Sequence, residues 1–369
     1  MITSLSRQGF KVVDGTICPP PQNSKVHLRE LHVEAVLHQR ERSRGGLQTH
    51  EKSLISRIAN GTEVVPEKIK PHIVLVEPRS ENERLFRWAR LHWSIPTSAG
   101  YGRRLRFLVF DEANGRLMGL LGLSDPVYAL GSRDAWIGWD AEAKRKRLRR
   151  VMDAFVLGAV APYNQLLAGK LMALLVTSAE VQQAYGDRYS GTTGRISGSA
   201  NHSPLALVTT TSALGRSSIY NRLRLDSRSV AHSVGYTTGS GDFQFANGLY
   251  DSLVAYARIH CSATAKHEKW GTGFRNRREV VKKTLTHLGL GEALLYHGVR
   301  REVFVFPMGT NARDALVYDS ELETFGESAD ELSDYWKTRW LIPRAERTPR
   351  FREFSRDSWR LWDEASPAT

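Results

Sequence analysis

The stretch Arg106-Phe-Leu-Val-Phe-Asp-Glu-Ala-Asn-Gly-Arg-Leu-Met-Gly-Leu-Leu-Gly-Leu123 decides how the centre of the chain folds. Two apolar runs flank a polar segment that ends in Asn114-Gly115, and both residue types tolerate the positive φ angles of a tight turn. We therefore predict a β-hairpin with strands over 106–110 and 116–123. The glycines in the second strand predict a close approach of other backbone.

Further strands and helices are expected on both sides of this hairpin. Short apolar runs predict strands over 73–76, 154–160, 205–211 and 303–306. Ser80 and Glu83 form a capping box that predicts the start of a helix, and the pattern after Pro162 predicts a helix over 164–175. This order indicates the α/β (α+β) class, with a mixed sheet flanked by helices.

The two ends of the chain differ from this centre. Apolar residues at helical spacing predict a helix over 26–44, which Gly45-Gly46 should end. In the last part of the chain, tryptophans alternate with arginines, a pattern that suits stacking on single-stranded bases and equally suits docking on the protein's own core or on a partner. We predict three parts: a helical N-terminal region (1–79), a core (80–320) and an Arg/Trp-rich C-terminal extension (321–369).

The charge composition favours a polyanionic partner. The chain has 52 Lys and Arg against 39 Asp and Glu, which gives a net charge of +13. Such an excess attracts nucleic acid, although an inert basic surface is the alternative. Six cations crowd one short segment and favour nucleic-acid contact over a merely solvated helix face: Lys144, Arg145, Lys146, Arg147, Arg149 and Arg150.

Several classes of protein are excluded by composition. No uncharged apolar run is long enough for a membrane-spanning helix, and the first residues lack the apolar core of a signal peptide. The two cysteines, Cys18 and Cys261, are too few for a disulfide scaffold or a cysteine-rich zinc site. We expect a cytoplasmic protein without a membrane partner. No P-loop or dinucleotide motif is present, so no cofactor is assigned.

The order of the elements resembles the acyltransferase fold of the GNAT superfamily. The resemblance implies that the strand ending near Val160 splays from its neighbour, and that backbone N–H groups at the start of the next helix face an anion. GNAT enzymes hold the pyrophosphate of coenzyme A there, and Gln165 and Gly169 echo their motif with a different glycine spacing. Tyr220 occupies the place of the general-acid tyrosine of many GNAT enzymes, with packing as its alternative role.

A narrower family shares several motif strings with this chain. They are Gly100–Arg104, Leu123–Pro126, Arg133-Asp134 with Ile137–Trp139, Tyr163-Asn164 with Gly169-Lys170, Thr209–Leu223, and Arg300–Val303. Together they resemble the DruA proteins of the Druantia anti-phage defence system, which have transposase-associated relatives. The resemblance covers about 85–311 and implies a defence role beside other proteins of the system, such as a helicase.

One segment departs from the pattern of these relatives. They tend to carry a histidine pair in Gly-x-Gly-His-x-His, whereas this chain reads Gly239-Ser-Gly-Asp-Phe-Gln244. Glutamine is a poor substitute for histidine as a metal ligand. We therefore predict no metal at this segment.

Polar side chains near the motif strings are candidates for phosphate or ligand binding. Arg103 and Arg104 form either a phosphate clamp or plain surface charge. Lys170 lies near a helix start, where the helix dipole disfavours a cation unless it serves an anion. The hydroxyl-rich string adds four residues that bind phosphate or only satisfy a turn and cap the short helix expected over 217–223: Ser212, Arg216, Ser217 and Asn221.

A second polar group is expected to stabilise a loop. Ser124, Asp125, Arg133 and Asp134 combine carboxylates with a guanidinium, and buried Arg–Asp pairing is expected unless a perturbed pKa supports acid–base chemistry. Arg216 has a similar alternative, an ion pair with one of these carboxylates.

Three functions stay open. The first is a defence-system component that contacts nucleic acid through basic surfaces. The second is a GNAT-like acyltransferase or other small-molecule transferase. The third is a DNA-processing enzyme, for which Asp125, Asp134 and Asp153 are the only acids nearby.

Overall fold

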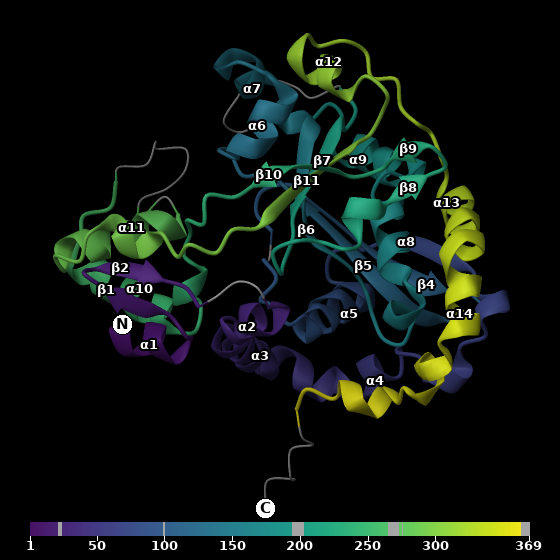
Figure 1. Ribbon diagram of the computed structural model, residues 1–369, viewed down its shortest axis with the longest axis horizontal. Helices are drawn as coiled ribbons and strands as arrows, with labels where there is room; N and C mark the ends of the chain where they lie inside the picture. The colour runs from purple at the N-terminus through teal and green to yellow at the C-terminus, as the bar shows by residue number, and fades with distance from the viewer. Residues whose placement is uncertain (21–23, 99, 194–202, 265–272, 275, 363–369) are drawn as a thin grey trace, which may run out of the picture.

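A mixed seven-stranded sheet forms the centre of the computed structural model (Figure 1). The structure describes residues 1–20, 24–98, 100–193, 203–264, 273–274 and 276–362. The strands follow the spatial order β10-β11-β7-β6-β5-β4-β3 and comprise β3 (Pro71–Leu75), β4 (Arg104–Asp111), β5 (Arg116–Ser124), β6 (Val151–Ala159), β7 (Leu207–Thr211), β10 (His232–Tyr236) and β11 (Glu302–Pro307). Neighbouring strands are antiparallel except β6 and β7, which are parallel. This arrangement, with helices on both faces, confirms the predicted fold class.

The central hairpin forms as the sequence predicted. Strands β4 and β5 pair in antiparallel register, with Asp111 opposite Arg116. Only Gly115 of the Asn-Gly pair takes a positive φ, of 69°, whereas the side chain of Asn114 accepts a hydrogen bond from the N–H of Arg116 at 2.9 Å. Gly122 permits close packing, because a Cβ there would lie 2.6 Å from the ring of Phe155.

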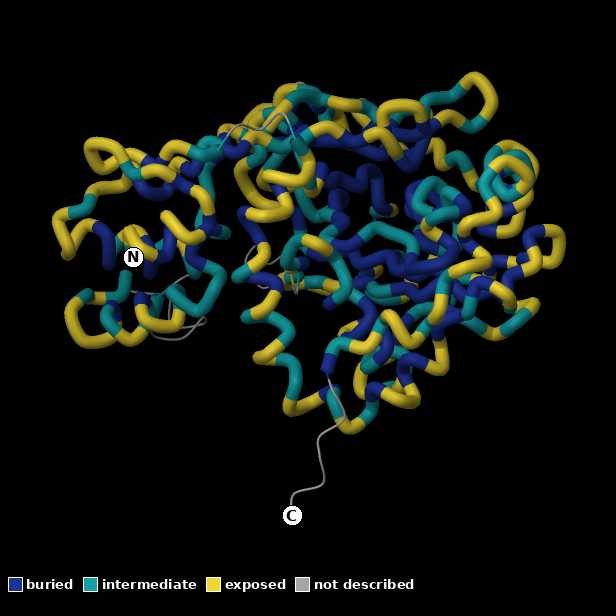
Figure 2. The backbone as a smooth tube through the Cα atoms, turned by 60° about the horizontal axis from the view of Figure 1, so that its bottom comes forward, coloured by how far each residue is buried: buried dark blue, intermediate teal, exposed yellow. Residues whose placement is uncertain are grey.

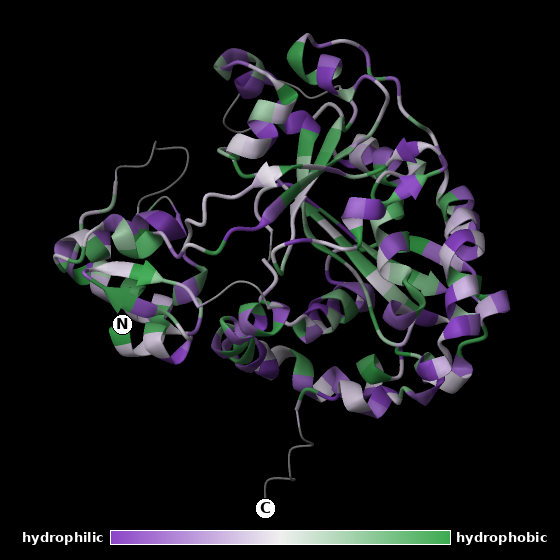
Figure 3. Cartoon of the chain, in the orientation of Figure 1, coloured by the Kyte–Doolittle hydropathy of each residue, from purple (hydrophilic) through white to green (hydrophobic). Residues whose placement is uncertain are grey.

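The sheet separates two hydrophobic cores. On one face, α8 (Ala168–Leu175), α9 (Ala179–Tyr189) and α13 (Ala329–Trp336) cover the largest cluster of buried side chains. On the other face, α4 (Glu51–Ile55) and α5 (Glu81–Ala89) cover a second cluster. The strands between these layers are mostly hydrophobic, and their backbone is enclosed by more exposed helices (Figures 2 and 3).

A small lobe lies beside the sheet and has a third core (Figure 1, left). It combines the first residues of the chain with the segment between β10 and β11. Its elements are α1 (Ile2–Arg7), β1 (Lys11–Val13), β2 (Thr16–Cys18), α10 (Leu249–His260) and α11 (Arg277–His287). Leu5, Phe245 and Leu285 are fully buried there.

Helices α2 (Lys25–Glu30) and α3 (Val33–Leu47) replace the single helix expected over 26–44. Helix α3 runs through Gly45-Gly46, so the prediction that these glycines end it is wrong. Neither glycine takes the left-handed conformation that a glycine helix end requires. The chain instead continues at Gln48 into a short 3-10 turn before α4.

The C-terminal extension wraps around the outside of the molecule (Figure 1, yellow). Beyond α13 it comprises a π-helical segment η11 (Lys337–Leu341), α14 (Ile342–Arg347) and the 3-10 turns η12 (Pro349–Glu353) and η13 (Arg356–Trp359). Trp336 is fully buried, and its Nε1–H donates to the carbonyl oxygen of Leu167 at 3.1 Å. These aromatic side chains therefore dock on the protein's own core.

The end of the described chain is bound to the helical layer below the sheet. Glu51 of α4 is buried, and it accepts hydrogen bonds from Nε1 of Trp88 and from the backbone N–H groups of Leu361 and Trp362 at 3.1, 2.8 and 3.2 Å. The Trp359 ring stacks on His92, with 4.0 Å between ring centroids.

The predicted boundaries at 79 and 320 fall between segments that pack together. Strand β3 from the first predicted part is the edge strand of the central sheet, and α13 from the last part packs on α8 of the core. Residues 363–369 of the extension lie outside the described part. No described helix has the length and apolar character that a membrane crossing would require.

Candidate functional site

A cleft opens where two neighbouring strands of the sheet diverge. Strands β6 and β7 pair only between Val151–Asp153 and Leu207–Thr209. Beyond Asp153, β6 stays paired with β5, while β7 stays paired with β11. The resulting cavity has a volume of about 350 Å³. Strand β6 therefore diverges from β7 beyond Asp153, as expected for the strand that ends near Val160.

A carboxylate and two hydroxyls lie side by side at the point of divergence. The register places Asp153 between Ser124 of β5 and Thr209 of β7, and all three line the cleft. Oδ2 of Asp153 accepts the N–H of Val127 at 2.9 Å. In the described part of the chain, Oδ1 of Asp153 and Oγ1 of Thr209 are buried without a hydrogen-bond partner.

The pKa of Asp153 differs strongly from that of an exposed aspartate. Burial disfavours the charged form and raises the pKa from 3.8 to about 7, although the hydrogen bond from Val127 and the charge of Arg133 oppose the shift. This carboxyl group can therefore accept or release a proton near neutral pH. From the sequence, Asp153 was expected only as one of three acids for a DNA-processing enzyme, because its burial depends on distant segments of the chain.

A half-buried guanidinium lines the same cleft. Arg301 precedes β11, and its NH2 lies 3.2 Å from Nε2 of His32. Its guanidinium carbon is 5.4 Å from the centre of the Phe243 ring. Burial lowers the pKa of Arg301, and no carboxylate of a described residue forms an ion pair with it.

Tyr220 lines the cleft from the start of η7 (Tyr220–Arg222). This element is a single 3-10 turn, which corrects the longer helix expected over 217–223. The Tyr220 ring makes edge contacts with Phe304 and Phe306, at centroid distances of 5.1 and 5.6 Å. Burial raises the pKa of its hydroxyl. These contacts show the packing role, and a general-acid role stays a prediction.

Arg103 is engaged inside the protein, whereas Arg104 is exposed. Nε of Arg103 lies 2.6 Å from Oδ1 of Asp125, and NH1 donates to the carbonyl oxygen of Arg149 at 2.7 Å. The Arg103 guanidinium also faces the rings of Tyr185 and Tyr189. Its donors are thus occupied by protein acceptors.

Arg133 is completely buried and holds the loop between β5 and α6 (Gly131–Ile137). It donates to the carbonyl oxygens of Val127 and Tyr128 at 2.8 and 3.1 Å, and to Oδ1 of Asp134 at 2.7 Å. Burial raises the pKa of Asp134, but hydrogen bonds from Lys144 and Arg133 outweigh it and hold the pKa below its usual value. Ser124 lies at the end of β5, where it lines the cleft.

The basic segment 144–150 is divided between internal and exposed cations. Lys144 of α7 (Ala141–Arg147) pairs with Asp134 at 2.7 Å, and Arg147 and Arg150 lie 3.4 and 3.2 Å from Asp319. The remaining positions are less enclosed: Arg145 and Lys146 are exposed, and Arg149 is half-buried. Lys146 pairs with Glu142. Much of this charge is therefore neutralised within the protein.

Glu302 organises the segment that follows β7. Its buried carboxylate accepts the N–H of Ser217 at 3.1 Å, Nδ2 of Asn221 at 3.2 Å and the hydroxyl of Ser233 at 2.8 Å. Its carbonyl oxygen accepts the N–H of Ser212. Sequence reasoning gave Glu302 no role of its own, although it lies in the motif string Arg300–Val303 and directly before an apolar strand.

Arg216 is exposed and forms no ion pair with any described residue. The alternative that it pairs with Asp125 or Asp134 is wrong, because those carboxylates pair with Arg103 and Arg133.

A cluster of cations lies at the start of α8. We call Lys170, Arg222 and Arg339 the basic cluster. Burial lowers the pKa of Lys170, and the charges of Arg222 and Arg339 lower it further. Nζ of Lys170 lies 4.9 Å from the centre of the Trp340 ring. No carboxylate of a described residue forms an ion pair with any residue of the basic cluster.

The two other residues of the expected pyrophosphate loop lie against protein. The carbonyl oxygen of Gln165 accepts Nε of Arg344 at 3.1 Å. A Cβ at Gly169 would lie 3.3 Å from the side chain of Ile219. The C-terminal extension therefore reaches the start of α8.

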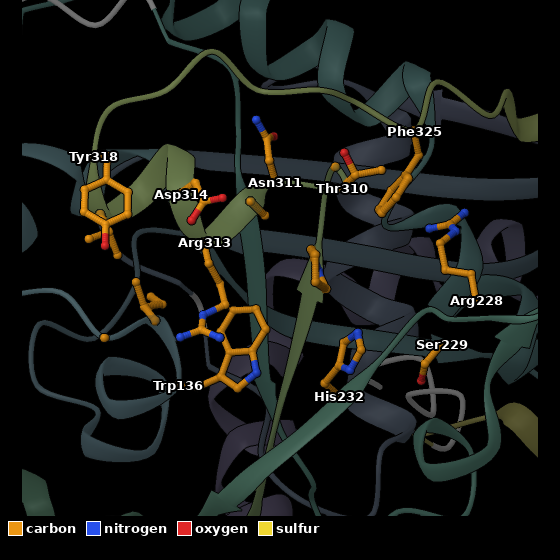
Figure 4. A pocket seen from close by; sticks show the side chains of 16 residues that line it. Trp136, Arg228, Ser229, His232, Thr310, Asn311, Arg313, Asp314, Tyr318 and Phe325 are labelled. Atoms are coloured by element: carbon orange, nitrogen blue, oxygen red, sulfur yellow. The ribbon is translucent and has the colours of Figure 1, made fainter.

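A larger open hollow of about 700 Å³ lies near the other edge of the sheet. In Figure 4, the Trp136 ring and the Arg313 side chain overlap, and His232 lies beside them. The Arg313 guanidinium carbon is 5.6 Å from the centre of the Trp136 ring. An aromatic ring next to a cation suits a nucleic-acid base and its phosphate.

The segment that departs from the family pattern lies at the base of the lobe. Asp242 pairs with Nε of Arg277 at 2.5 Å, and the buried Gln244 donates to the carbonyl oxygens of Gly241 and Leu294. Over the ranges that the structure describes, no group of three or more His, Cys, Asp or Glu could hold a metal ion.

Fold and site together define a mixed α/β protein with a polar cleft between diverging strands and a basic exterior. Residues 22–318 match the family model of the Druantia protein DruA. The chain is also 39% identical, over 351 residues, to the Druantia protein DruA of Escherichia coli (strain UMEA 4076-1), with 94% of this chain and 87% of that protein covered. The chain therefore belongs to the DruA family. No solved structure matches it.

Proposed function

We propose that this chain serves in Druantia anti-phage defence by contacting nucleic acid through its basic surface. The observation that carries the proposal is the basic cluster, in which Lys170, Arg222 and Arg339 come from three separate elements. Family membership supports the defence role, and the net charge of +13 supports a polyanionic partner.

The basic cluster has the properties of a phosphate-contacting surface. Like charges that are held close together repel one another. The folded chain is therefore stabilised when an anion binds between them. Burial lowers the pKa of Lys170, and the charges of Arg222 and Arg339 lower it further, in agreement with repulsion among the three cations. The adjacent Trp340 ring offers a face on which a base can stack.

The test is salt-dependent binding to labelled nucleic acid. We would titrate a single-stranded DNA of about 30 nucleotides, its duplex and the matching RNA, measuring fluorescence anisotropy at several salt concentrations. The triple change Lys170→Gln, Arg222→Gln and Arg339→Gln should weaken binding at least ~10-fold and reduce the log–log salt slope by about 2–3.

The matched control removes the same charge elsewhere. Its substitutions affect exposed lysines on other parts of the surface: Lys11→Gln, Lys52→Gln and Lys68→Gln. This control should change affinity only slightly. Equal losses in both triple variants would show that net charge alone attracts the polymer and would refute the basic cluster as the site. The double variant Trp136→Ala and Arg313→Ala asks whether the polymer lies over the open hollow instead.

A second candidate function is a small-molecule transferase with a GNAT-like core. The specific observation in its favour is the cleft that opens where β6 leaves β7. Calorimetry with acetyl-CoA should then show saturable heat, and substitution of the cleft residue Tyr220 by Phe should reduce any turnover. The absence of binding at millimolar acetyl-CoA would contradict an acyl-CoA-dependent activity.

A further inference from the structure

We propose that the cleft between β6 and β7 binds an elongated small molecule with an anionic group at one end and an N–H or O–H donor at the other. The inference deepens the second candidate function, because it names the ligand chemistry of the same cleft. It holds whether or not a group is transferred. Its basis is that Asp153 and Arg301 line one cavity and neither forms an ion pair within the described chain.

Asp153 provides the acceptor end. Its Oδ1 and the hydroxyl oxygens of Thr209 and Thr97 all lack a hydrogen-bond partner among described residues, and all three residues line the cleft. Thr209 is 0% exposed, so bulk water does not reach its side chain. Buried polar groups are almost always paired in native proteins. A ligand donor directed at Asp153 would satisfy this group.

Arg301 provides the cationic end. Its guanidinium contacts Nε2 of His32, whose pKa is lowered to about 3 by burial and by the charge of Arg301. The imidazole is therefore neutral and does not balance the guanidinium. A planar guanidinium binds a carboxylate or a phosphate through two parallel hydrogen bonds. An anionic ligand group would balance this half-buried charge.

The sheet register sets the separation of the two ends. Val305 of β11 lies beside Thr209, which lies beside Asp153. Arg301 precedes Val305 by four positions, about 13 Å along a strand, and β11 lies two strand spacings, about 10 Å, from β6. Besides its hydroxyl groups, the cleft is lined by apolar and aromatic side chains, among them Trp93, Phe155, Val156, Leu157 and Tyr220. The ligand therefore has an apolar middle.

The test uses a series of ω-amino carboxylic acids from aminobutanoate to aminooctanoate. Thermal unfolding is followed at pH 8 with each acid at millimolar concentration, next to hexanoate and hexylamine as single-ended probes. At least one amino acid of the series should raise the Tm by more than either single-ended probe. If no member does so, the proposal is refuted. If the amino acids raise the Tm and acetyl-CoA does not bind, this inference is supported and the acyltransferase function is refuted.

Two variants separate ligand binding from a structural role. Asp153→Asn keeps an acceptor for the N–H of Val127 and removes the buried charge, so the ligand-free Tm should rise by about 2–5 °C at pH 8 while the response to the probes is lost. Thr209→Val should weaken the response without unfolding the chain. Asp187→Asn, at an exposed position, should change neither quantity. A lower Tm for Asp153→Asn, or an unchanged probe response, would overturn the proposal.

Discussion

The carboxyl group of Asp153 couples the stability of the ligand-free chain to pH. Its pKa is about 7 in the folded state and about 4 when unfolded. The folded state therefore binds more protons between these values, and stability falls as pH rises through this range. We predict that Asp153→Asn gains about 2 kcal/mol more stability at pH 8 than at pH 5.5. Urea unfolding of both proteins at the two pH values measures this, and a gain that shrinks at pH 8 would contradict it.

In the loop beside the cleft, substitution of Arg133 should lower the free energy of unfolding the most. Arg133→Ala removes four hydrogen bonds and takes their donor from the carbonyl oxygens of Val127 and Tyr128, while the Asp134 carboxylate keeps only Trp139 and Lys144 as donors. We predict a loss of about 3–5 kcal/mol in the free energy of unfolding. Arg145→Ala, at an exposed position in α7, should stay within about 0.5 kcal/mol. Similar losses in both variants would contradict the structural role of Arg133.

The roles of residues could be predicted from the sequence where their partners are close in the chain. Arg133 and Asp134 are neighbours, so their pairing could be expected from the motif. Asp153 and Arg301 gain their character from burial between distant strands, which no local pattern reveals. Glu302 is similar, because its partners at Ser217 and Ser233 lie on other segments.

Among the elements, α13 connects the C-terminal extension to the core. Its Trp336 side chain is fully buried and hydrogen-bonded to the residue that precedes α8. Trp336→Ala should cost about 3–5 kcal/mol, because it leaves a large cavity and an unpaired carbonyl. Urea unfolding measures the loss, and limited proteolysis should cut the variant faster within the extension. Trp340→Ala, at a half-buried position, is the control and should cost much less.

Elements with strong local signals were predictable, and those that depend on tertiary contacts were not. The hairpin of β4 and β5 has both alternating apolar strands and a turn motif. Ser80 caps α5 as its spacing from Glu83 predicted. By contrast, α3 continues through two glycines, and the expected helix after Ser217 is a single 3-10 turn. In both cases packing decides where the helix ends, and local propensity does not.

At the scale of the whole molecule, the buried His32 and His297 and the half-buried His92 should make the protein sensitive to acid. Burial lowers the pKa of His32 to about 3, and those of His92 and His297 to about 4. The unfolded chain binds these protons near pH 6.5, so stability is complete above that pH and is lost as pH falls toward 4. Protonation of Asp153 stabilises the folded state as pH falls and so opposes the histidines. The net loss in the free energy of unfolding is at most about 3 kcal/mol per pH unit.

The urea midpoint as a function of pH tests this expectation. It should fall between pH 6.5 and pH 4.5, and the fall should be steeper in Asp153→Asn, which lacks the opposing group. A midpoint that stays level or rises on acidification would show that these histidines are not protected from protons in the folded state.

The sequence predicted the mixed sheet but missed how the lobe is assembled. The lobe combines residues 1–18 with the long segment between β10 and β11, and neither contains a signal for the other. The basic cluster was equally hidden, since Arg222 and Arg339 meet Lys170 only in the folded molecule. The alternating Trp and Arg pattern left base stacking and docking open, and burial of Trp336 shows docking on the core at that position, while stacking at the half-buried Trp340 stays a proposal.

The attachment of the chain's last described residues to Glu51 has a consequence for synthesis on the ribosome. Domains begin to fold as they emerge, N-terminal parts first. Helix α4 emerges early, yet its buried Glu51 obtains two of its three hydrogen-bond donors from Leu361 and Trp362. A nascent chain thus carries an incompletely satisfied carboxylate in its helical layer until residues 361 and 362 have been translated. Chains that are cut short by premature termination would keep this defect and become preferred substrates of cellular proteases.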